Sequence, residues 1–428
     1  MNYVFIAACI IMIIKVARRK LDFYSVGAIC HILYNFHCAY GIVFISSHEV
    51  RNSYYYISEI DIRVYVIVLL QMAILFAAMV LHDRNAMKWK SPLIVDNYSD
   101  RTKDRIFTIA CGIAWLIMLY NIMRIGVSNL NAEKSYIWAQ ISGLYVTSNW
   151  LGMAVFTYGL KNKKYILAIL GAGPVLLHFF FGSRAYFAVL CIIILLLKSE
   201  KIKNSLHKNL KVYILGIFAV VFILAYKRMY TAIKAGNIIG AFQVLTDPDT
   251  YAYVLRLGEP RIVLANLNYI ITNNVRLGGG DLLDRIISIV PYLNNVIRPG
   301  QYTAVSTILR EDLSSTYGLA SNIWGEFYAL GSYFLLFFMF LLWIKMLDWG
   351  NKLIARKDWS ANFYMPLVSY LAFYIHRLDF IKAIGNAKMV VMAMILFILA
   401  AIFVTKNSKI TLQLRGKRLG PLYEETDK

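Results

Sequence analysis

Residues 323–344 read IWGEFYALGSYFLLFFMFLLWI and contain a single charged side chain, that of Glu326. A helix needs about 20 predominantly apolar residues to cross a hydrocarbon core roughly 30 Å thick. In lipid each backbone group must find its partner inside the protein, so only helices and closed barrels can cross. The stretch is continuously apolar, without the alternation of a barrel strand, and so predicts a membrane-spanning helix.

Similar apolar blocks repeat along the whole chain of 428 residues, which is 59% hydrophobic and 16% charged. Soluble domains are usually about 45–50% apolar. We expect spans at 3–17, 22–46, 63–82, 106–123, 137–160, 165–181, 185–197, 212–226, 323–344, 361–376 and 387–404. The predicted fold is therefore all-α, a polytopic bundle of about eleven transmembrane helices.

The predicted spans divide the chain into an N-terminal bundle of eight spans (1–226), a long loop (227–322), three C-terminal spans (323–405) and a tail (406–428). The long loop has mixed charge and contains apolar helical stretches at 261–272 and 282–297. A structureless loop of this length is unusual in a compact protein, so we expect a partly helical cap.

The net charge of +21 does not indicate a nucleic-acid partner, because the basic residues are spread over many short connectors. They concentrate in alternate connectors, such as 18–20 and 198–211, and in the C-terminal tail. Connectors rich in Lys and Arg stay in the cytoplasm. The pattern therefore predicts an N-terminus outside, a cytoplasmic C-terminus, and a long loop on the outer face.

A turn between two almost uncharged spans is the first candidate for chemistry on that face. It reads FGSRAY, residues 181–186, and contains Arg184. Arginine can hold a phosphate with two parallel hydrogen bonds, and the Gly-Ser pair puts backbone N–H groups beside it. The alternative is an arginine that only reaches the lipid headgroups.

The second candidate region is the start of the long loop, where basic and tyrosine side chains cluster. Tyrosine rings stack on sugars, and arginine pairs with phosphates or uronic acids. The alternative is an interfacial belt of aromatic and basic residues. The predicted binding residues here are Arg228, Arg256 and Arg261.

The third candidate region combines the start of the ninth span with the end of the tenth. Glu326 lies about one turn inside an apolar segment, where an ionisable group is costly unless it is paired or faces a wet cavity. His376, Arg377 and Asp379 offer a base, a cation and a carboxylate at the same outer side. A local ion pair between Arg377 and Asp379 is the structural alternative.

Residues 321–331 fit the pattern S-x(4)-E-[FY]-Y-x(2)-G at the end of a long external loop. With Gly182-Ser183-Arg184 upstream and Arg377-x-Asp379 downstream, the chain resembles bacterial oligosaccharide repeat-unit polymerases, the Wzy-type O-antigen and capsule polymerases. The resemblance covers the layout of nearly the whole chain. It departs from the family at Ala185, where glycine is common, and at 329–331, where Asn-Phe-Gly is common.

The resemblance implies a GT-C-like glycosyltransferase in the bacterial cytoplasmic (inner) membrane. It would transfer a growing glycan from undecaprenyl diphosphate to the next lipid-linked repeat unit, at the outer face. Expected partners are the lipid-linked oligosaccharide and the bilayer, with a chain-length regulator protein as an open question. Arg184, Arg228 and Arg377 would stabilise the leaving diphosphate, and Glu326, His376 and Asp379 are the catalytic candidates.

No acidic pair marks a metal-dependent donor site, so we expect a metal-independent enzyme without a cofactor. A P-loop, a dinucleotide-binding glycine motif and an HExxH zinc motif are all missing from the sequence. Two other functions remain open. A glycan ligase would use the same carrier, loop and arginines. A flippase or other transporter would carry charged residues at mid-membrane and two similar halves.

Overall fold

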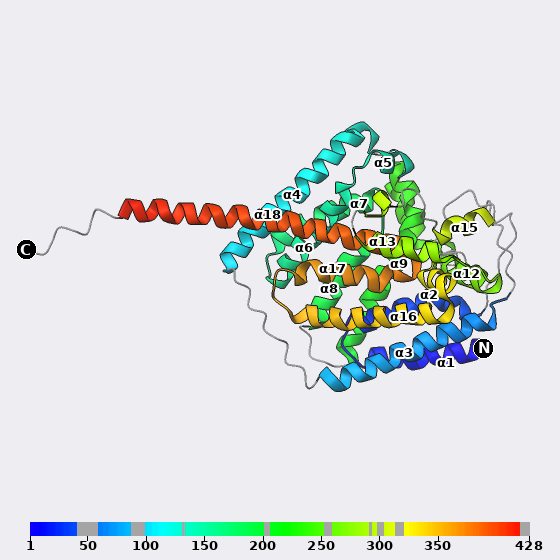
Figure 1. Ribbon diagram of the computed structural model, residues 1–428. Helices are drawn as coiled ribbons and strands as arrows, with labels where there is room; N and C mark the ends of the chain where they lie inside the picture. Colours follow the sequence, from blue (N-terminus) through cyan, green and yellow to red (C-terminus); the bar gives the residue numbers. More distant parts are fainter. Residues whose placement is uncertain are drawn as a thin grey trace, which may run out of the picture. The chain divides into compact units, whose positions relative to one another are not determined.

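The computed structural model describes residues 1–40, 59–86, 99–130, 132, 134–200, 206–251, 259–290, 293–297, 304–312 and 321–419. Every regular element in these ranges is a helix, as Figure 1 shows. The all-α prediction is therefore confirmed for the described residues. The chain forms two compact units, and each contains segments from both halves of the sequence.

Unit 1 consists of Met1–Pro92, Phe179–Arg356 and Tyr364–Lys388. Its described helices are α1 (Asn2–Ala17), α2 (Phe23–Asn35), η1 (Phe36–Ala39), α3 (Ile62–Ala86), α8 (Ala185–Glu200), α9 (Leu206–Lys234), α10 (Ile238–Thr246), α12 (Glu259–Thr272), α13 (Gly279–Ile289), α14 (Leu293–Ile297), α15 (Val305–Asp312), α16 (Ile323–Ala355) and η3 (Ile375–Arg377). Five of them lie in the long connector that was expected to be partly helical.

Unit 2 consists of Leu93–His178, Lys357–Phe363 and Met389–Lys428. It contains α4 (Asp100–Ile125), η2 (Val127–Asn129), α5 (Lys134–Gln140), α6 (Leu144–Lys161) and most of α7 (Tyr165–Phe180), and it shares α17 (Ala361–Tyr374) and α18 (Phe380–Leu419) with unit 1. Glycines let α6 and α7 pack backbone to backbone. A Cβ atom on Gly152 would lie 2.6 Å from the carbonyl oxygen of Gly171.

Among the described residues, four helical segments are long and apolar enough to cross a membrane: Ile62–Arg84, Asp100–Ile125, Ile323–Ala355 and Phe380–Lys406. Shorter apolar helices occur at Asn2–Ala17, Tyr165–Phe180 and Asn209–Ile223. These helices indicate a membrane protein. The count of eleven spans, the GT-C-like arrangement and the orientation stay predictions.

Two predicted spans differ from the helices observed. The block at 137–160 is not continuous, because α5 ends at Gln140 and α6 begins at Leu144. The Oδ1 atom of Asn121 accepts a hydrogen bond of 2.8 Å from the backbone N–H of Ser142, which satisfies this donor where the helix is interrupted. The block at 22–46 contains α2 and η1, and its residues 41–46 lie outside the described ranges.

The decisive apolar stretch is also more complex than one straight span. The helix α16 is interrupted at Gly331 and at Ser332, whose φ of 54° is left-handed. The side chain of Arg276 donates to the Tyr328 carbonyl oxygen over 3.2 Å and to the Ser332 hydroxyl over 2.6 Å. It thereby satisfies a carbonyl group freed by the interruption. The residues before the break contain Glu326.

The helices α2, α3, α12 and α16 pack against one another in unit 1. Glycines mark the closest approaches. A Cβ atom on Gly27 of α2 would lie 2.8 Å from the Leu347 Cδ1 atom of α16. A Cβ atom on Gly325 of α16 would lie 2.6 Å from the Ile270 Cδ1 atom of α12. This close packing of α16 against α2 and α12 positions the polar residues at its first turn.

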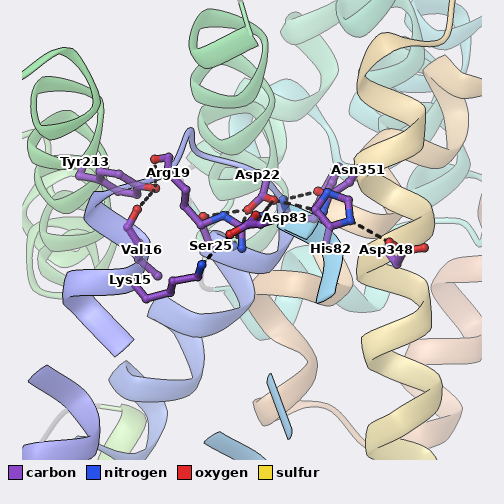
Figure 2. A network of polar contacts seen from close by, with 11 residues as sticks. Lys15, Val16, Arg19, Asp22, Ser25, His82, Asp83, Tyr213, Asp348 and Asn351 are labelled. Carbon is purple, nitrogen blue, oxygen red and sulfur yellow. Dashed lines mark hydrogen bonds and ion pairs between the residues drawn. The ribbon is translucent and has the colours of Figure 1, made fainter. Parts of the chain in front are cut away.

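Ion pairs join α1, α2, α3 and α16 in a cluster that Figure 2 shows from close by. We call it the Asp22 network, and it comprises Lys15, Arg19, Asp22, His82, Asp83, Asp348, Asn351 and Lys352. Asp22 also accepts a 2.8 Å hydrogen bond from the backbone N–H of Ser25, and so caps α2. The network connects helices that are far apart in the sequence.

Candidate active site

Two of the predicted arginines converge on one carboxylate in unit 1. The Nη2 atom of Arg184 lies 2.9 Å from Oε2 of Glu259, and Nη1 of Arg377 contacts the same oxygen. The side chains of Arg184, Glu259 and Arg377 are 17%, 13% and 29% exposed, so the cluster is partly buried. We call these three residues the Glu259 triad.

The turn before α8 directs Arg184 into the triad. Gly182 has φ +86°, a left-handed conformation that side chains other than glycine rarely adopt. A Cβ atom here would lie 2.9 Å from Cζ of Tyr230, so space also requires glycine. The guanidinium of Arg184 donates a second hydrogen bond, 3.1 Å long, to the carbonyl oxygen of Ile223 in α9. The Gly-Ser-Arg turn therefore holds its arginine from two sides.

Tyrosines lie around the triad. The hydroxyl of Tyr34 donates to Oε1 of Glu259 over 3.5 Å, the long limit of a hydrogen bond. The guanidinium carbon of Arg377 lies 5.3 Å from the centre of the Tyr374 ring, within cation–π distance. Burial, the largest single effect, lowers the pKa of Arg377, but the Glu259 carboxylate, Tyr374 and Tyr34 together raise this pKa by more. The net pKa shift is upward, and Arg377 stays charged.

Glu326 forms a second ion pair, which is fully buried. Its Oε1 atom lies 2.7 Å from Nε of Arg285, and the two side chains are 0% and 1% exposed. Its Oε2 atom accepts a 2.7 Å hydrogen bond from the backbone N–H of Phe380. The carboxylate thus connects α16, α13 and the start of α18. Its predicted catalytic role stays a prediction, whereas these contacts are those of a residue that holds three helices together.

Asp379 is buried at the start of α18 and does not form the local pair considered as an alternative. Its Oδ1 atom accepts a 2.8 Å hydrogen bond from the backbone N–H of Lys382, as an N-cap does. Its Oδ2 atom lies 2.7 Å from the Lys382 ammonium and accepts from the Ser321 hydroxyl over 3.3 Å. Arg377 pairs instead with Glu259, so the structure does not support the local Arg377–Asp379 pair, which was the structural alternative.

His376 lies beside the triad in an aromatic environment and is 1% exposed. The indole Nε1 of Trp324 donates a 2.8 Å hydrogen bond to its Nδ1 atom. Its ring stacks with Tyr34, with ring centres 5.4 Å apart, and lies 5.1 Å from the ring of His31. The Nε2 atom of His376 has no partner within the described part of the chain. Its predicted catalytic role also stays a prediction.

The remaining predicted binding residues are not part of the triad. Arg261 is buried in the first turn of α12, two residues after Glu259. Arg228 belongs to α9, but its side chain lies outside the described residues, and so does the whole of Arg256. Substrate binding by these three arginines stays a prediction.

Glu259, Arg285 and Tyr34 were not among the site residues predicted from the sequence. The sequence around Glu259 could have indicated a site residue, since Glu259 is an acid within a segment rich in arginine and tyrosine. Arg285 had a weaker signal, because a buried glutamate in an apolar helix requires a cation from another segment. Tyr34 had none, since it resembles any tyrosine of an apolar block.

No protein-family model, curated protein or solved structure matches this chain. The assignment of function therefore depends on the site and on the resemblance in layout and motifs.

Proposed function

We propose that this protein is a metal-independent glycosyltransferase that polymerises lipid-linked oligosaccharide repeat units. It transfers the growing glycan from undecaprenyl diphosphate to the next lipid-linked unit. The reaction takes place at the outer face of the bacterial cytoplasmic membrane, with the N-terminus outside and the C-terminus in the cytoplasm. The product is an O-antigen, a capsule or an exopolysaccharide.

The observation that carries the proposal is the meeting of two motif arginines at one point. Arg184 comes from the Gly-Ser-Arg turn and Arg377 from the Arg-x-Asp segment, and both contact Oε2 of Glu259. Paired guanidinium groups are suited to the oxygens of a diphosphate, because each can donate two parallel hydrogen bonds. Tyr34 and Tyr374 lie beside them, and the Tyr34 hydroxyl contacts Glu259.

In this mechanism the two arginines stabilise the leaving group. The acceptor hydroxyl oxygen forms a bond to the anomeric carbon of the donor glycan. The bond from that carbon to the diphosphate oxygen breaks, and its electron pair stays on the diphosphate. The hydroxyl proton passes to a base, for which Glu326, His376 and Asp379 are the predicted candidates.

The test replaces Arg184 or Arg377 by alanine in the native host and separates surface polysaccharide on a gel. We expect the ladder of long chains to collapse to single repeat units, as in a gene deletion, while the protein remains in the membrane fraction. Arg63→Ala is the matched control, because Arg63 pairs with Asp61 outside the triad and is 42% exposed. Chains of normal length in both triad variants contradict the proposal. Long glycan that accumulates on the carrier instead indicates a ligase.

A further inference from the structure

The Glu259 carboxylate lies where a bound anion would lie. One of its oxygens accepts from two guanidinium groups that come from different parts of the chain. Arginine pairs of this kind bind carboxylate and phosphate with the same geometry. Two positive charges face one negative charge within the triad, so the three residues together retain a positive charge.

The backbone that carries Glu259 is fixed, whereas its side chain can turn. The helix α12 is held by a 3.0 Å hydrogen bond from Asn322 to the Val263 carbonyl oxygen and by a 2.8 Å bond from the Asp61 N–H to Asn268. Glu259 is the first residue of this helix. A glutamate side chain has several staggered rotamers, so its carboxylate can leave the arginines while the helix stays in place.

We propose that Glu259 is an exchangeable counter-ion. The diphosphate of the lipid carrier displaces its carboxylate from Arg184 and Arg377, and the carboxylate returns when the spent carrier leaves. This inference rests on the proposed function, since it assigns a positioning role at the same site. Glu259 keeps the two guanidinium groups together in the empty site and competes with the product for them.

The electrostatics support exchange in both directions. A diphosphate has more negative charge and more acceptor oxygens than a carboxylate, so it gains more from two guanidinium groups. Glu259 is tethered beside those groups, so its effective concentration there is high and it recaptures them when the ligand dissociates. Without this competitor an anion binds more tightly and dissociates more slowly.

The experiment titrates inorganic pyrophosphate into the purified full-length protein in detergent and measures affinity by calorimetry. Glu259→Gln keeps the size of the side chain and removes its charge. We expect it to bind pyrophosphate roughly ten- to hundred-fold more tightly than the wild type, the range of a charge-assisted hydrogen bond. In cells, the same variant should make less long-chain glycan, because the product is retained.

Three further variants separate this effect from others. Asp61→Asn removes one acidic charge elsewhere in unit 1 and should leave the affinity unchanged. The double variant Glu259→Gln/Arg184→Ala should lose the gain in affinity. Should Glu259→Gln fail to fold, Glu259→Asp replaces it, and its shorter carboxylate should give a smaller gain.

Two results overturn the exchange. One is a Glu259→Gln protein, or its Asp substitute, that binds pyrophosphate no more tightly than the wild type. The other is an equal gain in the Asp61→Asn control. If Arg184→Ala cells still lack long chains, the exchange alone has failed and the proposed function stands. If those cells make normal chains, the proposed function has failed with it.

Discussion

The Glu259 triad and the Asp22 network are both clusters of basic and acidic side chains in unit 1, but their charges differ in balance. The network has three basic residues (Lys15, Arg19 and Lys352), three acidic ones (Asp22, Asp83 and Asp348) and one histidine, His82. The triad has two arginines and one glutamate. Balanced charges attract one another, whereas surplus positive charge attracts an anion from outside.

The clusters also differ in what they connect. Figure 2 shows the network at the places where α1, α2, α3 and α16 approach one another. Arg19 contacts both Asp22 and Asp83, and so bridges two helices. The triad instead joins a turn, a helix start and a short 3-10 segment. We infer that the network mainly stabilises the fold and that the triad mainly binds ligand.

The buried pair between Glu326 and Arg285 is the strongest test of the inference that charge-balanced clusters stabilise the fold, because it is balanced and lies near the triad. Replacing Glu326 by alanine should lower the free energy of unfolding by about 3–5 kcal/mol, since it leaves a buried guanidinium without its counter-charge. Thermal unfolding of the purified protein measures this. The double replacement of Glu326 and Arg285 by leucine should recover much of the loss. A Glu326→Ala protein of normal stability that makes no long chains would instead support the catalytic prediction for Glu326.

Asp22 tests the network itself. Replacing it by alanine removes the cap of α2 and the hydrogen bonds to Arg19 and Asn351. We expect the free energy of unfolding to fall by about 1–3 kcal/mol, while pyrophosphate affinity stays unchanged. Asp22→Asn, which keeps an oxygen for the cap, should lose less. A clear change in pyrophosphate affinity would break the division between the two clusters.

His82 should give the smallest effect. Its Nδ1 atom lies 3.0 Å from Oδ1 of Asp348, and the two side chains are 22% and 34% exposed. Partly exposed pairs contribute little, so His82→Gln should change the free energy of unfolding by about 1 kcal/mol or less. Chemical denaturation of His82→Gln and Asp22→Ala in parallel compares the two losses of stability. A loss as large as that of Asp22→Ala would show that the network acts as one unit.

The sequence was sufficient to predict the helical fold and to select Arg184 and Arg377 as candidates on one face. Long apolar runs predict helices because lipid leaves few other backbone conformations. Counting the spans assigns one face to turns that are far apart in the sequence, and this led to the two arginines. The helical stretch predicted at 261–272 lies within α12, which begins at Glu259.

The pairing of particular charges could not be predicted in the same way. Which cation meets Glu326 depends on how α13 packs beside α16, and hydropathy contains no information about this rotation. The same limit applies to Arg377, which pairs with Glu259 and not with Asp379, the partner that the structural alternative named. The break before α6 was also missed, because Asn121 satisfies the backbone from another helix.

The hydrogen bond between Trp324 and His376 determines where the imidazole carries its hydrogen. An indole N–H can only donate, so Nδ1 of His376 must offer its lone pair. The ring is therefore the neutral tautomer with its hydrogen on Nε2. With Nδ1 occupied, the ring has a hydrogen to give on Nε2 and no free lone pair to take one. His376 can therefore act as the predicted base only after the bond from Trp324 breaks, whereas the carboxylates of Glu326 and Asp379 already carry lone pairs.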